Sequence, residues 1–502
     1  MTAVKNAMAK QTTLHRIALP LAGALLPLSL APFFLWPLGI FSAGVLAYLL
    51  PGRTIKASYW HSVLYCLGVF AVGASWVFNS INVYSSTPLA AALLLTALFV
   101  IVLALFFSLP FALLGLVKRS AAAQLLAFPA LWVVAEWFIG WILTGFPWVY
   151  LGYGHVHSWL AGWAPLGGVW SISWIVAFCG ATAASLLQQR SRSSIVAVSV
   201  CLLLWLAGLG LKQATWTTPQ KPLSIGVLQP NIPQNDRWQI SYRDRIISNN
   251  LSLGEQLWDN QLVIWPEAAI PELQHRVMPL IRQLDQLARQ TDTAFITGIP
   301  VYNFADDEFY NSVIALGKAS GEYRKQHLVP FGEYVPLATL LRKLGGFFDL
   351  PMSGFTPGTD DQPLITAGDH KIATAICYEI AYQNLVRKLS PDASLILTVS
   401  NDTWFGDTLA PHQHLSMAQM RALENGKPVI RATNDGITAL INHKGEIFEK
   451  LPQFQEGILQ SSVTPHTGTT PYNRFGHWPM LLFVGLCLGV CFWVSRKRHS
   501  QG

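Results

Sequence analysis

Long apolar stretches, separated by short polar joins, fill the first 211 residues, and one more follows near the C-terminus. Each is long enough, alone or as half of a tight hairpin, for a membrane-crossing helix. Of the 27 acidic residues, Glu136 is the only one before Asp236. The pattern predicts an α-helical membrane bundle of eight transmembrane helices. These segments are about 17–33, 36–50, 57–79, 88–117, 121–143, 163–187, 194–211 and 478–495.

Basic residues indicate how these helices are oriented. Three alternate joins (33–36, 80–87 and 144–162) carry no Lys or Arg, whereas the other joins and both ends are basic. Because Lys and Arg collect on the cytoplasmic side, both termini are expected there, with 212–477 on the opposite side. The residues concerned are Lys5, Lys10, Arg16, Arg53, Lys56, Lys118, Arg119, Arg190, Arg192, Arg496, Lys497 and Arg498.

The start of the chain has a second interpretation, because a basic stretch before an apolar one also describes a cleaved signal peptide over residues 1–30. Retention is favoured, since the alternation of basic joins stays in phase only if the first helix remains. The prediction is a multi-pass protein of the bacterial inner membrane. Its domains are a membrane domain over 1–211 with seven helices, a periplasmic domain over 220–465, and an eighth helix over 478–495 before a cytoplasmic tail.

Between the membrane segments the pattern changes to short runs rich in β-branched residues. At least one helical stretch lies among them, over 273–290, where Val277, Leu280, Ile281, Leu284 and Leu287 recur at a spacing of three to four. Strands alternating with helices predict a layered α/β domain. The expected strands are 223–228, 262–265, 294–299, 311–316, 372–377, 394–399, 429–432 and 437–442.

Composition supports this division and excludes some functions. With 52% hydrophobic and 12% charged residues, the chain is too apolar for an ordinary soluble protein. The net charge of +7 mainly reflects the cytoplasmic basic residues, so no nucleic-acid partner is expected.

One cysteine, Cys377, stands outside the apolar segments that hold the other five, so it has no disulfide partner in its own domain. Two charged residues lie upstream in apolar surroundings, Glu267 after Leu-Val-Ile-Trp-Pro and Lys325 before Gln-His-Leu. Alone, Cys377 would be an inert core residue and Lys325 a solvated charge. Together, a carboxylate, an ammonium and a thiol indicate covalent acyl transfer, with Glu267 as base and Lys325 stabilising the oxyanion.

Further candidates surround these three. Glu333 is expected to orient Lys325 or a substrate amine, with a plain surface carboxylate as the alternative, and Tyr378 and Glu379 flank the nucleophile. Four aromatic residues are candidates for substrate binding, with ordinary packing or membrane anchoring as the alternative. They are Trp238, Trp404, Phe405 and Trp148.

Two other features of the sequence give weaker evidence of function. His412 and His414 resemble metal ligands only in spacing, and since nothing else supports a metal site, surface histidines are favoured. Glu136 is an acidic residue inside a predicted helix, and either a functional or a hydrogen-bonded structural role fits it.

Three ordered motifs carry a family resemblance. Trp265-Pro266-Glu267, the segment from Arg324 to Pro336, and Ile376-Cys377-Tyr378-Glu379 resemble the nitrilase, or carbon-nitrogen hydrolase, superfamily with its Glu-Lys-Cys triad. Joined to eight membrane helices, the whole chain is similar to the apolipoprotein N-acyltransferase family of Gram-negative bacteria. The resemblance implies an αββα sandwich, a phospholipid acyl donor, a diacylglyceryl apolipoprotein acceptor, no cofactor and a monomer.

Two other functions stay open at this stage. A membrane-anchored amidase or nitrilase would use the same triad with water as the second nucleophile, although eight helices exceed what an anchor requires. A lipid-binding or transport protein would carry polar residues through its helices, and Glu136 is the single acidic residue there.

Overall fold

The computed structural model describes residues 15–84, 87–117, 120–121, 123–330, 332–334 and 354–497. Five basic residues used for the orientation lie outside these ranges, as do Phe331, Val335 and Pro336 of the second motif. Those five are Lys5, Lys10, Lys118, Arg119 and Arg498. The chain forms two compact units, one of residues 1–214, 408–416 and 475–502, the other of 215–407 and 417–474.

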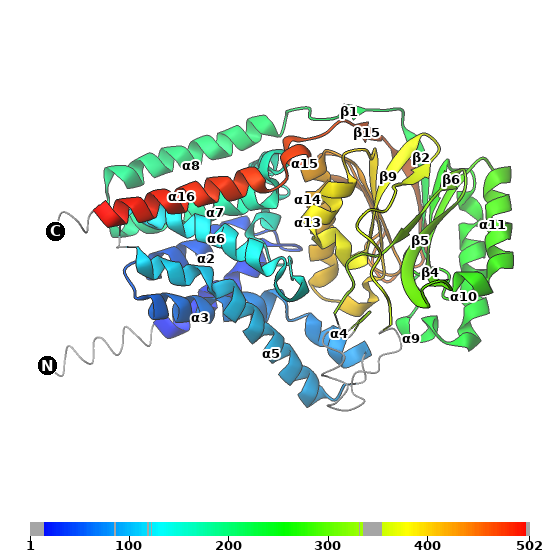
Figure 1. Cartoon of the computed structure of the whole chain (residues 1–502), viewed down its shortest axis with the longest axis horizontal. Helices are drawn as coiled ribbons and strands as arrows, with labels where there is room; N and C mark the ends of the chain where they lie inside the picture. The colour runs from blue at the N-terminus through cyan, green and yellow to red at the C-terminus, as the bar shows by residue number, and fades with distance from the viewer. Residues whose placement is uncertain are drawn as a thin grey trace. The chain divides into compact units, whose positions relative to one another are not determined.

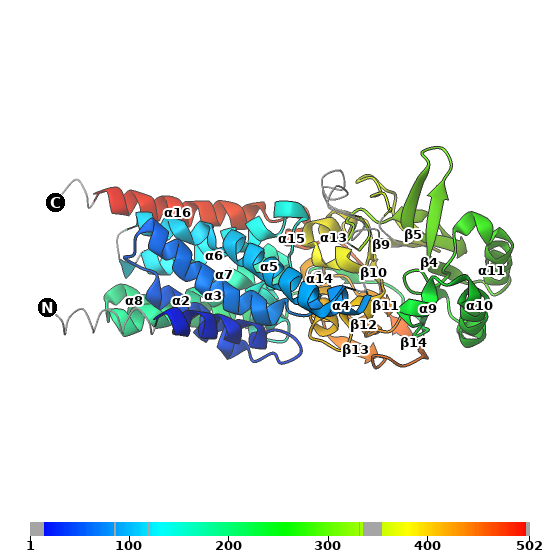
Figure 2. The same ribbon diagram turned by 90° about the horizontal axis from the view of Figure 1, so that it is seen from below.

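The first unit is helical, and several of its helices run alongside one another (Figure 2). Proline occupies the first turn of α2, α6 and α7, where its missing N–H costs nothing. The Thr54 hydroxyl caps α3 by accepting from the Ala57 N–H at 3.2 Å. The helices are α2 (Trp36–Leu49), α3 (Ile55–Gly73), α4 (Val77–Tyr84), α5 (Leu89–Ser108), α6 (Phe128–Ile139), α7 (Ala164–Gln188), α8 (Arg192–Leu211) and α16 (Trp478–Lys497).

Each predicted membrane segment contains helical residues, but their lengths differ. Among the described residues, four helices are long and apolar enough to cross a membrane: Leu89–Leu116, Trp159–Gln188, Arg192–Leu211 and Trp478–Ser495. A fifth results if α3 and the helix after it, bent by 55°, form one span. The segments 36–50 and 121–143 contain shorter apolar helices, Trp36–Leu49 and Ala123–Ile139.

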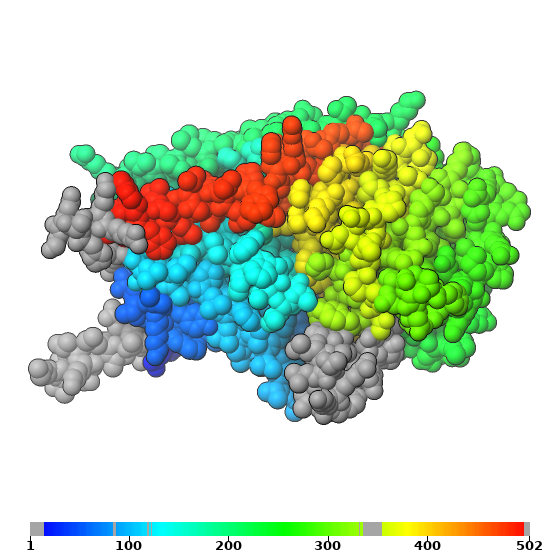
Figure 3. Space-filling model, viewed as in Figure 1, coloured from blue at the N-terminus to red at the C-terminus, as the bar shows by residue number. Residues whose placement is uncertain are grey.

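Apolar side chains lie on the outside of this unit. Along α16, the side chains of Trp478, Leu482, Leu486 and Trp493 are more than half exposed, and Figure 3 shows this helix as an uncovered ridge. An exposed apolar surface of this kind fits a hydrocarbon solvent rather than water. Glu136 is fully buried here, where it accepts hydrogen bonds from Trp132 Nε1 at 3.0 Å and the Leu151 N–H at 2.8 Å.

The second unit is built on two large sheets, and a further pair of two-residue strands, β1 (Thr218–Pro219) and β15 (His466–Thr467), lies outside them. The six-stranded sheet has the order β14-β2-β3-β4-β5-β7, and the seven-stranded sheet the order β13-β12-β11-β10-β9-β8-β6. Strands β2, β3 and β4 are parallel, as are β9, β10 and β11. The first sheet comprises β2 (Leu223–Gln229), β3 (Leu262–Ile264), β4 (Ala294–Asn303), β5 (Glu308–Gly317), β7 (Glu322–Arg324) and β14 (Gly457–Val463). The second comprises β6 (Ala319–Ser320), β8 (Ile365–Ala367), β9 (His370–Ile376), β10 (Leu395–Ser400), β11 (Val429–Thr433), β12 (Ala439–Ile441) and β13 (Ile447–Lys450).

Alternation along the strands divides the core into layers. Leu262 and Ile264 join a buried cluster that also contains Ile376 and Leu397 of the other sheet. Val263, between them, faces the opposite way and packs with Leu284 of a covering helix. Figure 1 shows α10 (Ile240–Gly254) and α11 (Met278–Gln290) on one outer face, and α13 (Gln383–Leu389) and α14 (Ala410–Asn425) on the other. This is the expected αββα sandwich.

Candidate active site

Three of the candidate residues lie just beyond the carboxyl ends of strands. Glu267 follows β3, Lys325 follows β7 and Cys377 follows β9. Parallel strands bring their carboxyl ends to one edge, where side chains from separate parts of the chain converge. The placement therefore follows from the topology.

Cys377 sits at a sharp corner between β9 and the short 3-10 helix η11 (Cys377–Ala381). Its φ of 53° lies in the left-handed region, which is unfavourable for a residue with a side chain. The Glu379 carboxylate holds the corner by accepting from the N–H groups of Ile376 at 2.7 Å and Gln326 at 2.6 Å. Such strain on a supported turn is typical of a presented nucleophile.

A network of four buried side chains forms the polar centre. Lys325 Nζ lies 2.8 Å from Glu333 Oε1 and 3.6 Å from Glu267 Oε1. The Asn311 amide donates to both carboxylates, at 2.8 Å to Glu267 and 2.9 Å to Glu333. The Asn401 N–H donates to the second Glu267 oxygen at 2.7 Å. Glu267 is thus held by donors on both oxygens.

The electrostatics of the thiol follow from its burial. Burial, reinforced by the Glu267 charge, raises the pKa of Cys377 to about 12, and the Lys325 charge acts in the opposite direction. Burial alone would lower the pKa of the Lys325 ammonium, but Glu333 and Glu267 outweigh it and hold that pKa above its ordinary value. Lys325 is therefore a permanent cation, and Cys377 needs a base before it can react.

The main chain at Glu267 is packed against strand β4. A Cβ added to Gly298 would lie 2.7 Å from the Cα of Glu267 and from the carbonyl oxygen of Pro266. No side chain fits there, so glycine permits the close approach. Arg237, almost fully buried, donates from Nη1 to the Glu267 carbonyl at 3.2 Å.

A hollow of about 380 Å³ is lined in part by residues that adjoin this network along the chain or through a main-chain hydrogen bond. Its lining includes Trp238, Phe309 and Phe355. Phe309 lies two residues before Asn311 on β5, and the Phe355 N–H donates to the Glu333 carbonyl at 3.2 Å. Aromatic walls beside polar groups are typical of a site for an amphipathic ligand.

The remaining aromatic candidates are placed differently. Trp404 and Phe405 belong to a 3-10 helix, Asp402–Phe405, which begins one residue after Asn401, and Phe405 is buried. Trp148 is also fully buried, in the helical unit, where its indole N–H donates to Gln413 Oε1 at 2.6 Å and its ring stacks on His414. Within the described ranges, no group of three or more His, Cys, Asp or Glu side chains is arranged to hold a metal.

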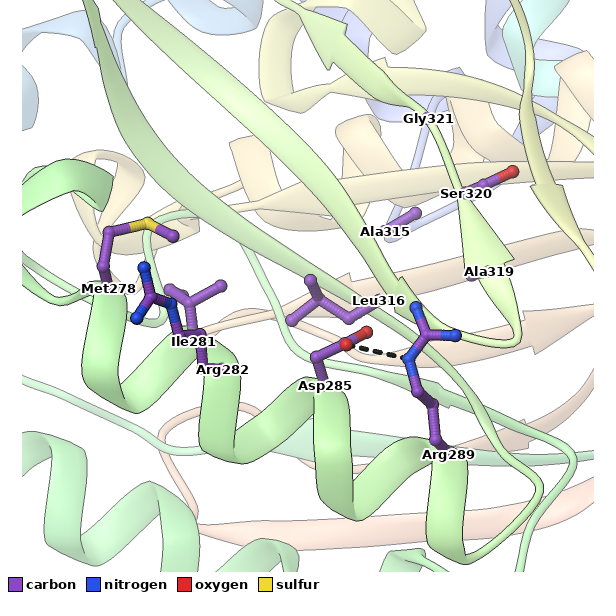
Figure 4. Close-up of a pocket in the computed structure, with 10 residues that line it drawn as sticks. All are labelled: Met278, Ile281, Arg282, Asp285, Arg289, Ala315, Leu316, Ala319, Ser320 and Gly321. Atoms are coloured by element: carbon purple, nitrogen blue, oxygen red, sulfur yellow. Dashed lines mark hydrogen bonds and ion pairs between the residues drawn. The ribbon is translucent and has the colours of Figure 1, made fainter.

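A second hollow, of about 410 Å³, lies apart from the chemistry. It opens between α11 and the edge of β5, where Asp285 pairs with Arg289 beside Arg282 and Leu316 (Figure 4). None of the candidate site residues lines it.

Sequence reasoning missed several members of the site. Asn311, Arg237 and the Ser400-Asn401-Asp402 segment were not predicted, although Asn311 interrupts an apolar run and Ser400 ends one. A polar residue inside a strand with two buried faces is the signal that would have found Asn311 and Ser400.

Comparison with known proteins identifies a family for the second unit. Residues 225–472 match the family model described as carbon-nitrogen hydrolase, which places the second unit in that class. A solved structure, the carbon-nitrogen hydrolase from Helicobacter pylori G27, is similar at 17% identity over 48% of this chain and 89% of that one, with a TM-score of 0.38.

The N-terminal domain and the full-length relatives identify the family more specifically. Residues 22–182 match the apolipoprotein N-acyltransferase N-terminal domain. The chain is 43% identical to the apolipoprotein N-acyltransferase of Azotobacter vinelandii, over 96% of this chain and 94% of that one. It is 42% identical to that of Vibrio cholerae, over 97% and 99%. The chain belongs to the apolipoprotein N-acyltransferase family.

Proposed function

We propose that the protein transfers a fatty acyl chain from a membrane phospholipid, through a thioester on Cys377, to the N-terminal α-amine of a diacylglyceryl-cysteine apolipoprotein. Family membership makes it an N-acyltransferase of lipoprotein maturation. The observation that supports the thioester route is the convergence of Glu267, Lys325 and Cys377 in one buried network.

In the first half-reaction Glu267 takes the proton from Cys377, and the sulfur attacks the ester carbonyl of the phospholipid. Lys325 stabilises the developing oxyanion, together with a backbone N–H that we assign to Tyr378. The new C–S bond forms, the ester C–O bond breaks, and Glu267 returns its proton to the departing lysophospholipid oxygen. The enzyme is left as the thioester.

In the second half-reaction the acceptor amine attacks the thioester carbonyl. Glu267 takes a proton from the nitrogen, the C–S bond breaks, and the sulfur recovers the proton. A thioester suits this order because it reacts readily with amines, provided that water is excluded. The lysophospholipid leaves before the amine reacts, so the two substrates share one thiol in turn.

The supporting residues act by position. Glu333, at 2.8 Å, orients Lys325, while Glu379 holds the corner that presents the thiol. Trp238 lines the aromatic hollow, which we assign to an apolar part of a lipid substrate. Trp404 and Phe405 are proposed to border the same site, and Trp148 to support the lipid path in the membrane unit.

The membrane organisation is part of the proposal. We infer eight transmembrane helices, with both termini cytoplasmic and the domain over 220–465 periplasmic in a bacterial inner membrane, acting as a monomer. The exposed apolar side chains of α16 support membrane embedding. The orientation rests on the basic residues of alternate joins.

The test is intact-protein mass spectrometry after incubation with phospholipid, with and without neutral hydroxylamine. Wild type should gain one acyl mass that hydroxylamine removes, whereas Cys377→Ala should gain none. Cys487→Ala, which removes a buried thiol of the last helix, is the matched control and should acylate normally. Addition of a diacylglyceryl peptide should discharge the acyl group onto the peptide amine.

Two results would contradict the proposal. Wild type that binds phospholipid without an acyl adduct would exclude the thioester. An adduct that water discharges as fast as the peptide amine would instead indicate a hydrolase of the amidase type.

A further inference from the structure

Ser400, the last residue of β10, lies fully buried between two groups that compete for its hydroxyl. Its Oγ donates to Asp402 Oδ1 at 2.7 Å. The parallel register of β10 with β9, which pairs Val399 with Ile376, places Ser400 beside Cys377, and the two side chains also form a hydrogen bond. A hydroxyl has one O–H and two lone pairs. Since its proton points to Asp402, the bond to sulfur runs from the thiol S–H to Oγ.

Asp402 itself is held from the other side. It is buried and pairs with the fully buried Arg431 guanidinium, which also donates from Nε to the Ile437 carbonyl at 3.2 Å. A Cβ on Gly436 would lie 2.4 Å from Asp402 Oδ2, so glycine leaves the space that this carboxylate occupies. Asp402 therefore keeps a charged partner whichever way the Ser400 hydroxyl turns.

We propose that Ser400 is a further catalytic residue, whose hydroxyl turns from Asp402 to the Cys377 sulfur whenever that sulfur carries negative charge. Asp402 and Arg431 are the positioning residues of this arrangement. The inference deepens the proposed function and depends on Cys377 as the nucleophile.

Negative charge on the Cys377 sulfur must be stabilised twice in each catalytic cycle. The sulfur is negative when Glu267 has removed its proton and again when the thioester breaks. Burial, Glu267 and Asp402 all oppose a thiolate there, and Lys325 is the cation that favours it. Lys325 also pairs with Glu333 at 2.8 Å, which weakens its stabilisation of a thiolate. A second hydrogen-bond donor to the sulfur would therefore stabilise the thiolate further. A hydrogen bond to a charged group is worth more than one to a neutral group.

The reaction of Cys377 with iodoacetamide, followed by mass spectrometry of the Cys377 peptide across a pH series, tests this without any lipid. Ser400→Ala should slow alkylation about tenfold to a hundredfold at each pH below the pKa of the thiol, because the variant holds less thiolate. Ser400→Thr keeps a hydroxyl and should restore most of the rate.

Thr398→Val is the matched control. Thr398 lies two residues earlier on the same face of β10 and is fully buried, and its hydroxyl has no hydrogen-bond partner among the described residues. Its replacement should leave the alkylation profile unchanged. Thermal unfolding of each variant confirms that the fold is retained.

Asp402→Asn should change the alkylation rate in the opposite direction. It can therefore replace Ser400→Ala in the test if that variant does not fold. With the full charge of Asp402 gone, the hydroxyl is released to sulfur, so alkylation at a given pH should become faster rather than slower. An unchanged profile in Ser400→Ala, an equal loss of rate in Thr398→Val, or slower alkylation in Asp402→Asn would overturn the inference. Failure of the thioester itself would instead appear as normal alkylation without acylation by phospholipid.

Discussion

Replacing Asn311 by aspartate changes one atom at the centre of the network. The lost atom is Nδ2, which donates to Glu267 at 2.8 Å and to Glu333 at 2.9 Å. An ionised aspartate in its place would face two carboxylates at that range, and each approach costs about 6 kcal/mol at an effective dielectric constant of about 20. The introduced carboxyl group must therefore take up a proton.

In its protonated form the introduced acid has a single O–H. It can therefore donate a hydrogen bond to only one of the two carboxylates, and the other loses its donor. The lost hydrogen bond to a charged group is worth about 1.5–3 kcal/mol, which corresponds to roughly a tenfold to 150-fold slower acylation of Cys377. The Asn311→Asp variant is active only while the new carboxyl group holds its proton. The loss should therefore deepen as the pH rises.

The assay is the rate of acyl-mass gain after mixing with phospholipid, measured from about pH 6 to 9. Asn249→Asp is the control, because Asn249 also donates its amide to a carboxylate, Glu456 at 2.8 Å, but on the exposed surface. Rates for Asn311→Asp equal to wild type across this range would refute the reasoning. An equal loss in Asn249→Asp would show that the effect is not local.

Two further predictions concern stability. Burial raises the pKa of Glu379 to about 7, although backbone N–H groups that donate to it act in the opposite direction. The folded state therefore holds this proton more tightly than the unfolded state does. As a result, the free energy of unfolding falls as the pH rises toward 7. Glu379→Gln should reduce the fall in Tm over that range, and an unchanged slope would contradict this assignment. Gly436→Ala should cost about 1–3 kcal/mol, because its Cβ meets Asp402 Oδ2 at 2.4 Å. Gly457→Ala, where the nearest atom is 3.7 Å away, should change Tm much less, and equal losses would show that no clash is involved.

Much of the α/β domain was predictable because its strands are buried on both faces. Apolar runs that contain β-branched residues, such as 223–228 and 294–299, have no competing helical period, and the structure places β2 and β4 there. Of the charged candidates, Glu267 was equally visible, since it follows an apolar run that rarely tolerates a charge, whereas Lys325 was found through its motif.

The polar support of the site was harder to predict. Asn311 and Ser400 sit within strands, where a single polar residue in a sequence is also compatible with a solvent-facing position. Their distant partners come from other parts of the chain: Glu333 for Asn311, and Cys377 for Ser400. Only the register of β5 with β7 and of β10 with β9 brings these groups together.

Hydropathy also misses where apolar helices break. The hydropathy of 57–79 predicts one span, yet the structure bends this segment by 55° after Gly73. Likewise 121–143 contains π-helical, α-helical and 3-10 turns in succession. Average hydrophobicity is insensitive to such changes, because they depend on neighbouring helices that satisfy the freed backbone groups.

The close packing of Gly298 against the Glu267 main chain has an evolutionary consequence. Any side chain at that position would push the Glu267 main chain away from β4, so mutation there would displace the carboxylate that we propose as the base. The walls of the aromatic hollow, by contrast, include Trp238, Phe309 and Phe355, and Glu267 is not among the residues that line it. Under the proposed function, substitutions in these walls would change substrate preference over evolutionary time without moving the proposed base.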